Sequence, residues 1–103
     1  MYIDEYGVQY SDDKKRIILC PQDFKGAYVI PAEVDYIEGG AFGSVLGITS
    51  VTFTNSDVFF DEDAFSGCYN LESIHVPSGT KDLFAQKFRD AYIDCDLDCI
   101  TED

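Results

Sequence analysis

The stretch that decides the fold of this chain is Ala64-Phe65-Ser66-Gly67-Cys68-Tyr69-Asn70-Leu71-Glu72-Ser73-Ile74-His75-Val76-Pro77. Its opening pair, Ala64-Phe65, repeats Ala41-Phe42 at an offset of 23 residues. The same offset relates further apolar positions: Ile30 to Phe53 and Val76, Ile37 to Phe60, Ile48 to Leu71, and Val51 to Ile74. A sequence period of about 20 to 29 residues is typical of proteins built from stacked repeats.

Each repeat unit predicts a short strand and a tight turn. The residues 50–53 alternate polar and apolar side chains, as a half-buried strand does. The segment 71–76 repeats this design, and 28–30 resembles the same strand in an earlier, incomplete unit. A second apolar pair, Val34 and Ile37, precedes a glycine-rich turn. Because one unit cannot bury its own apolar face, neighbouring units are expected to stack.

These residues resemble the BspA-type leucine-rich repeat over about residues 26–80. The pattern consists of Ile30-Pro31-x-x-Val34-x-x-Ile37-x-x-x-Ala41-Phe42 and of the stretch 64–77 quoted above. The first unit departs from it at Gly43-Ser44-Val45 and at Gly47, where the second has Ser66-Gly67-Cys68 and Asn70. The resemblance implies a β-rich repeat fold, a short right-handed leucine-rich-repeat solenoid. It also implies that Cys68 is structural.

The chain is expected to form one domain over residues 1–103. Residues 1–29 would supply an N-terminal β-hairpin cap and a partial repeat, 30–77 two repeats of 23 residues, and 78–103 a helical cap and an acidic tail. The hairpin turn is predicted at Asp12-Asp13-Lys14, with a loop over 22–26. Thr80 is predicted to cap a helix whose buried stripe is Phe84, Phe88, Ala91 and Tyr92. A short strand is expected through 97–100.

Charge and hydropathy exclude several classes of function. The formal net charge of −13 opposes nucleic-acid binding, which needs a basic surface for phosphate. No apolar run approaches the roughly 18 residues of a membrane span. The start Met1-Tyr2-Ile3-Asp4-Glu5 lacks the features of a signal peptide. The protein would be cytoplasmic if Met1 is its native start, whereas the family resemblance implies a secreted or surface location.

The residues present predict no enzyme and no cofactor. Of four cysteines none forms CxxC, and His75 is the single histidine, so zinc spacing is absent. Cys95 and Cys99 either pair or, by preference, stay reduced. Asp94, Asp96 and Asp98 copy three ligand positions of a calcium loop, but Cys99 replaces the glycine that such a loop needs. A His75–Cys68 dyad is rejected, because Cys68 holds a structural position and His75 an outward one.

Two groups of outward residues are the candidate partner-binding sites. One lies on the main strand face and contains Ser50, Thr52, Ser73 and His75; the other is a stack of Tyr36 and Phe59. In the resembled family such domains commonly mediate adhesion and protein binding at bacterial surfaces. The sequence therefore favours a non-catalytic protein-interaction module. The alternative is a structural or self-associating unit, since two repeats fall below the usual three for a stable stack.

Overall fold

The computed structural model describes residues 1–90 and 99–102. Its elements, in chain order, are β1 (Tyr2–Ile3), β2 (Gln9–Tyr10), β3 (Arg16–Leu19), β4 (Lys25–Ile30), β5 (Tyr36–Ile37), β6 (Gly47–Phe53), β7 (Phe59–Phe60), β8 (Ser73–Val76), α1 (Lys81–Asp90) and β9 (Ile100–Glu102). No helix among them is long and apolar enough to cross a membrane.

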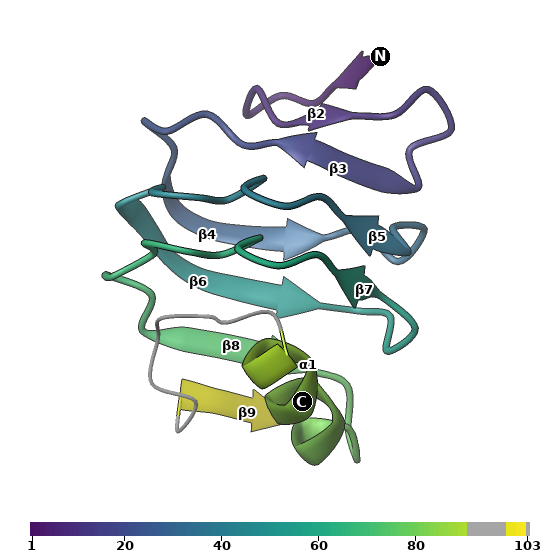
Figure 1. Ribbon diagram of the computed structural model, residues 1–103, viewed down its shortest axis with the longest axis vertical. Helices are drawn as coiled ribbons and strands as arrows, with labels where there is room; N and C mark the ends of the chain where they lie inside the picture. Colours follow the sequence, from purple (N-terminus) through teal and green to yellow (C-terminus); the bar gives the residue numbers. More distant parts are fainter. Residues whose placement is uncertain (91–98, 103) are drawn as a thin grey trace.

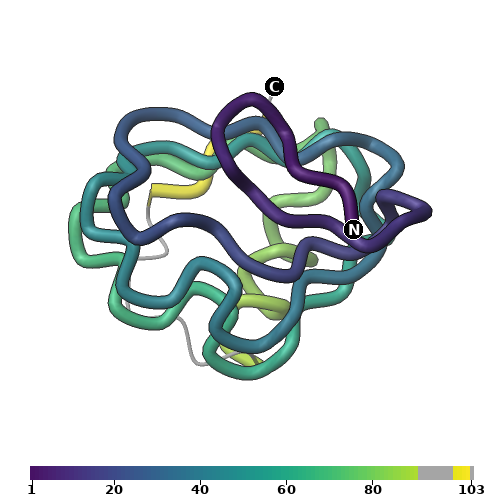
Figure 2. Tube along the Cα trace, turned by 90° about the horizontal axis from the view of Figure 1, so that it is seen from above, coloured from purple at the N-terminus to yellow at the C-terminus, as the bar shows by residue number. Residues whose placement is uncertain are grey.

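The strands form two sheets (Figure 1). Sheet A has the order β1-β2-β3-β5-β7, antiparallel from β1 to β3 and parallel from β3 to β7. Sheet B has the order β4-β6-β8-β9 and is parallel throughout. From β3 to β8 the chain alternates between the sheets, so that successive loops overlie one another when the molecule is seen from above (Figure 2).

The strand register reproduces the 23-residue period. Ser50 pairs with Ala27 on one side and with Ser73 on the other, and Tyr36 pairs with Phe59. Each of these partners is 23 positions away. The period predicted from the apolar pattern is therefore confirmed as the step between paired strands.

A third line of backbone contacts joins the turns that carry the Ala-Phe pairs. The amide of Phe42 donates to Ala64 O at 2.8 Å, and that of Ser44 donates to Ser66 O at 2.7 Å. Cys68 Sγ lies 2.9 Å from the carbonyl oxygen of Phe42, to which it donates. These bonds tie the turn of one repeat to the turn of the next, and they give Cys68 the structural position that the resemblance implied.

The core between the sheets is apolar. No polar or charged residue among those described is buried. Phe42 and Phe65, at equivalent repeat positions, stack with ring centroids 4.9 Å apart and planes 5° from parallel. The strands alternate as predicted: Val51 and Phe53 are buried, while Thr52 between them is half-buried and faces outward.

The N-terminal segment contains the predicted hairpin, with β2 antiparallel to β3. Two details differ from the sequence analysis. The pair Tyr2–Ile3 forms an additional strand, β1, beside β2. Residues 22–26 are not entirely loop, because β4 already begins at Lys25. A two-residue strand carries too little alternation to be recognised from sequence.

The helix α1 buries Phe84 and Phe88 as predicted. Thr80 holds the predicted N-cap position, since its carbonyl oxygen accepts from the Phe84 amide at 2.9 Å, but its hydroxyl donates to Pro77 O at 2.6 Å. The carboxylate of Glu102 accepts instead from the Lys81 amide at 2.9 Å. Among the described residues the C-terminal strand is β9, Ile100–Glu102, which overlaps the predicted strand at Ile100 and leaves Cys99 outside it. Several predicted positions lie outside the described residues. They are helix positions 91 and 92, strand positions 97 and 98, and the calcium-like positions 94, 96 and 98.

Candidate interaction surface

The outward face of sheet B carries two columns of side chains in register. The first column contains Ala27, Ser50 and Ser73; the second contains Val29, Thr52, His75 and Thr101. Paired strands lie about 4.8 Å apart, so each column is a continuous row. Most of these side chains are small and only half-buried, and Val29 is 57% exposed. We call this set the sheet-B face.

The imidazole of His75 has a hydroxyl partner that the sequence analysis did not foresee. Thr101 Oγ1 lies 3.0 Å from His75 Nδ1. A nucleophilic hydroxyl needs a base that a third group orients. Within the part of the chain that the structure describes, the Thr101 contact is the one side-chain hydrogen bond of His75. Among the described residues no further side chain is hydrogen-bonded to the His75 ring, so the contact is a pair of hydrogen-bonding groups without an orienting third member.

A second outward column, on sheet A, consists of Arg16, Tyr36 and Phe59. The rings of Tyr36 and Phe59 stack as predicted, with centroids 5.4 Å apart, while the neighbouring Ile37 and Phe60 are buried. The guanidinium carbon of Arg16 lies 4.5 Å from the centroid of the Tyr36 ring, a cation–π contact that was not predicted. We call this set the sheet-A column.

Polar contacts fix the Tyr36 end of the sheet-A column. Tyr36 donates its hydroxyl proton to Asp61 at 2.8 Å. This hydrogen bond to a carboxylate raises the pKa of the Tyr36 hydroxyl. Arg16 also reaches Glu38, with Nη1 3.3 Å from the carboxylate oxygen. The Tyr36 ring is therefore held in place from both sides.

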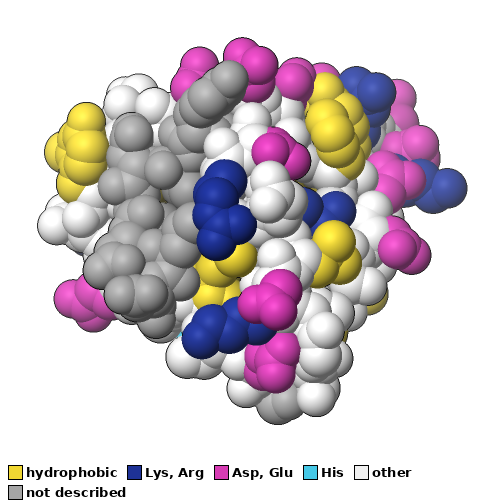
Figure 3. All heavy atoms as spheres, turned by 60° about the horizontal axis from the view of Figure 1, so that its bottom comes forward, with side chains coloured by type: hydrophobic (Ala, Val, Ile, Leu, Met, Phe, Trp, Pro, Cys, Tyr) yellow, Lys and Arg dark blue, Asp and Glu magenta, His cyan; other side chains and the backbone are white. Residues whose placement is uncertain are grey.

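The Phe59 end of the sheet-A column stays open. Phe59 is 56% exposed, although Lys87 and Asp90 of α1 border it. Lys87 is held there because its Nζ donates to Val58 O at 2.9 Å. On the end of the molecule that α1 forms, Lys and Arg side chains lie among Asp and Glu, with hydrophobic atoms between them (Figure 3). The sheet-A column thus presents an aromatic ring in mixed charged surroundings.

The six predicted site residues therefore fall on two different sheets. Ser50, Thr52, Ser73 and His75 lie together on the sheet-B face, whereas Tyr36 and Phe59 lie on sheet A. The 23-residue offset predicted the strand positions of all six residues, because each pairs with a residue 23 positions away. Thr101 and Arg16 were missed, since neither pairs at that offset: Thr101 faces His75 and Arg16 faces Tyr36.

Comparison with known families decides the identity of the repeat. A family model described as a BspA type leucine rich repeat region (6 copies) matches residues 26–96. The chain belongs to the BspA-type leucine-rich repeat family. No curated protein and no solved structure matches it. Leucine-rich repeat domains of this kind generally mediate protein interactions and are typically non-catalytic. The sheet-B face and the sheet-A column are thus surfaces of a BspA-type repeat.

Proposed function

We propose that this BspA-type repeat chain is a non-catalytic protein-interaction module whose partner binds the sheet-B face. The observation that carries the proposal is the pair of outward columns in register. Small side chains allow a partner to approach the strands closely, and the hydroxyls of Ser50, Thr52 and Ser73 with the imidazole of His75 supply hydrogen-bonding groups. Val29 adds exposed apolar area at one edge.

The architecture that suits this function is a short right-handed solenoid with closed ends. Both sheets gain one strand with each repeat, which supports the solenoid. Parallel strands of one sheet are almost always joined by right-handed connections. The N-terminal hairpin and α1 lie where the first and last repeats would otherwise expose apolar core, so they would serve as caps.

The setting we propose is recognition or adhesion at a bacterial surface, in keeping with the family. The acidic composition favours a partner with a basic contact surface, because the net charge of −13 raises the association rate of an oppositely charged protein. Such steering weakens as salt screens the charges. Binding that is faster at low ionic strength would accord with this setting.

A paired affinity capture tests the proposal. The wild-type domain and a Thr52→Arg/His75→Glu variant are immobilised and exposed to cell lysate and to extracellular protein. The matched control is Leu46→Glu/Tyr69→Arg, which introduces the same charges at exposed turn positions outside both sheets. We expect the wild type and the control to retain a partner that the sheet-B variant loses.

Other outcomes would redirect or overturn the proposal. Equal retention by all three proteins would place the site elsewhere, and a Tyr36→Ala/Phe59→Ser variant would then test the sheet-A column. Circular dichroism on every variant separates loss of binding from loss of folding. If the wild-type domain retains no protein, the result contradicts the proposal that a separate protein partner binds it.

Self-association is the second candidate function. Among the described residues, β4 and β9 each have one paired neighbour, so both are edges of the parallel sheet B. Edge strands are templates for pairing with another chain. Sedimentation velocity over a wide concentration range tests this function. An increase in sedimentation coefficient with concentration would favour it, and a constant monomer value would exclude it.

A further inference from the structure

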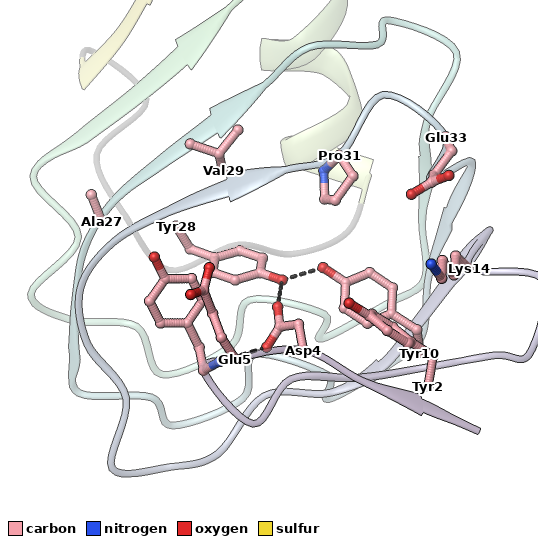
Figure 4. Close-up of a pocket in the computed structure, with 11 residues that line it drawn as sticks. Tyr2, Asp4, Glu5, Tyr10, Lys14, Ala27, Tyr28, Val29, Pro31 and Glu33 are labelled. Atoms are coloured by element: carbon pink, nitrogen blue, oxygen red, sulfur yellow. Dashed lines mark hydrogen bonds between the residues drawn. The ribbon is translucent and has the colours of Figure 1, made fainter.

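A pocket of about 350 Å³ lies between β4 and the N-terminal segment, at the edge of the sheet-B face that Ala27 and Val29 form (Figure 4). Four tyrosines line it: Tyr2, Tyr6, Tyr10 and Tyr28. Ala27 and Val29 of β4 also line it, together with Pro31 just after the strand. The pocket thus combines tyrosine rings with charged side chains, and one side of it is the edge strand of sheet B.

Ring contacts and hydrogen bonds hold the tyrosines in fixed positions. Tyr6 packs edge-on against Tyr28, and Tyr2 packs edge-on against Tyr10, with centroids 5.9 Å and 5.7 Å apart. The hydroxyls of Tyr10 and Tyr28 are hydrogen-bonded to each other. Tyr28 also donates to a carboxylate oxygen of Asp4 at 2.5 Å, a bond visible in Figure 4. A preorganised pocket binds with little loss of side-chain entropy.

The charges at the pocket favour a cation. Asp4, Glu5 and Glu33 line it, and Lys14 is the one basic residue among the lining residues. The Nζ atom of Lys14 lies 4.3 Å from the centroid of the Tyr2 ring. The structure therefore already contains an ammonium group seated on one of these rings. Three carboxylates against one ammonium leave an excess of negative charge for an incoming cation.

The edge of β4 supplies backbone groups beside the pocket. Within the described residues β4 pairs with β6 alone, and Lys25–Ile30 is one of the two longest strands. On such an edge, alternate N–H and C=O groups point away from the neighbouring strand. An extended peptide can add to an edge of this kind, with main-chain bonds giving affinity and side-chain pockets giving specificity.

We propose that this site binds an extended peptide segment that pairs with the free edge of β4 and inserts a lysine or arginine side chain into the tyrosine pocket. Main-chain pairing with β4 would position the peptide. Tyrosine faces and the carboxylates of Glu5 and Glu33 would select the cationic side chain. The site is separate from the Thr52–His75 part of the sheet-B face, so it does not depend on the function proposed above.

The test uses labelled heptapeptides Ac-Thr-Val-Thr-X-Thr-Val-Thr-NH2 with lysine, arginine, norleucine or glutamate at X, measured by fluorescence polarisation. Norleucine keeps the aliphatic chain of lysine without its charge. We expect the lysine and arginine peptides to bind about tenfold more tightly than the norleucine peptide. Equal binding of the lysine and norleucine peptides would overturn the cationic pocket.

Protein variants locate the binding. Glu5→Gln/Glu33→Gln removes two exposed carboxylates at the pocket, and Glu62→Gln/Glu72→Gln removes two exposed carboxylates elsewhere. We expect the first variant to lose about fivefold to tenfold in affinity for the lysine peptide and the second to lose little. Equal losses would mean general charge attraction and would contradict a site at the pocket. If only the Thr52→Arg/His75→Glu variant loses affinity, the peptide binds the sheet-B face and not the pocket.

N-methylated peptides test the pairing with β4. Methyl groups on alternate backbone nitrogens remove every donor that faces one side of an extended strand. Because β4 can contact only one side of the peptide, methylation in one register should abolish binding and methylation in the other should spare it. If methylation in the two registers weakens peptide binding equally, addition of the peptide to β4 as a strand is excluded.

Discussion

Ser44 and Gly67 occupy the same position in successive repeats, and both have left-handed backbone, with φ of 59° and 78°. The amide of Ser44 donates to Ser66 O, so the two turns lie directly against each other. A left-handed φ costs an L-residue about 1 to 2 kcal/mol, whereas glycine adopts it freely. At this turn position the first repeat thus carries a strain that the second avoids.

Ser44→Gly should therefore stabilise the protein. Relief of the left-handed strain outweighs the added flexibility of glycine, and we expect the free energy of unfolding to rise by about 0.5 to 1 kcal/mol. Urea denaturation followed by circular dichroism measures it. Ser66→Gly is the control, since Ser66 has no positive φ and should lose stability. A drop in stability for Ser44→Gly would show that its side chain matters more than its backbone.

Gly67→Ala should destabilise the protein by about 1 to 2 kcal/mol. A Cβ atom at Gly67 would lie 3.1 Å from Ser44 Oγ and 3.3 Å from Ser44 N. The substitution adds this crowding to the left-handed backbone. The double variant Ser44→Gly/Gly67→Ala removes the hydroxyl contact and should recover part of the loss. Unfolding midpoints of the four proteins in this cycle provide the measurement.

Gly47→Ala should be more harmful, by about 2 to 3 kcal/mol, although Gly47 has no positive φ. A Cβ there would lie 2.4 Å from the carbonyl oxygen of Phe24, which the backbone cannot tolerate without moving β4 from β6. Thr49→Ala, two residues along β6, is the matched control and should change stability little. Thermal unfolding of both variants would decide the matter; equal midpoints would refute the steric argument.

Phe88→Ala should cost about 3 to 5 kcal/mol by leaving a cavity in the core. The Phe88 ring stacks on Phe60 with centroids 4.8 Å apart and also meets Phe53 and Phe65. Leu83→Ala changes the same helix at a side chain that is 48% exposed, so its effect should stay below about 1 kcal/mol. If both variants unfold at the same denaturant concentration, α1 does not stabilise the core.

Stability should fall between about pH 10 and pH 12 because of Tyr10. Burial raises the pKa of its hydroxyl to about 12, so folding favours the neutral form. The stabilisation is complete below the unfolded pKa near 10 and disappears as pH rises through the folded pKa. Thermal melts from pH 9 to 12 should show a shallower decline for Tyr10→Phe than for the wild type. Tyr69→Phe, at a position 74% exposed, should follow the wild type.

The sequence predicted the repeating part of the fold closely. The 23-residue offset assigned inward and outward positions on β6 and β8, and therefore the columns through Thr52 and Tyr36. The assignment of inward and outward positions has a strong physical basis, because a register shift of one residue would turn every buried side chain of a strand outward. The departure at Gly47 is explained only by the structure, where the Phe24 carbonyl occupies the space of a side chain.

What the sequence could not predict comes from contacts outside the repeat. The contacts of Thr101 with His75 and of Arg16 with Tyr36 join elements whose spacing follows no period. The Lys81 amide binds Glu102, although Thr80 has the residue type and position of an N-cap. The tyrosine pocket likewise joins the N-terminal segment to β4, a pairing without a sequence signal.

The opposite positions of the N-terminus and β9 along the stack of strands have a mechanical consequence (Figure 1). A force applied between the two ends would act across the strands, in the direction of their hydrogen bonds. Bonds loaded in this way open one after another, whereas bonds loaded in shear must break together. Under tension the molecule should therefore lengthen in small steps at low force, releasing one repeat at a time.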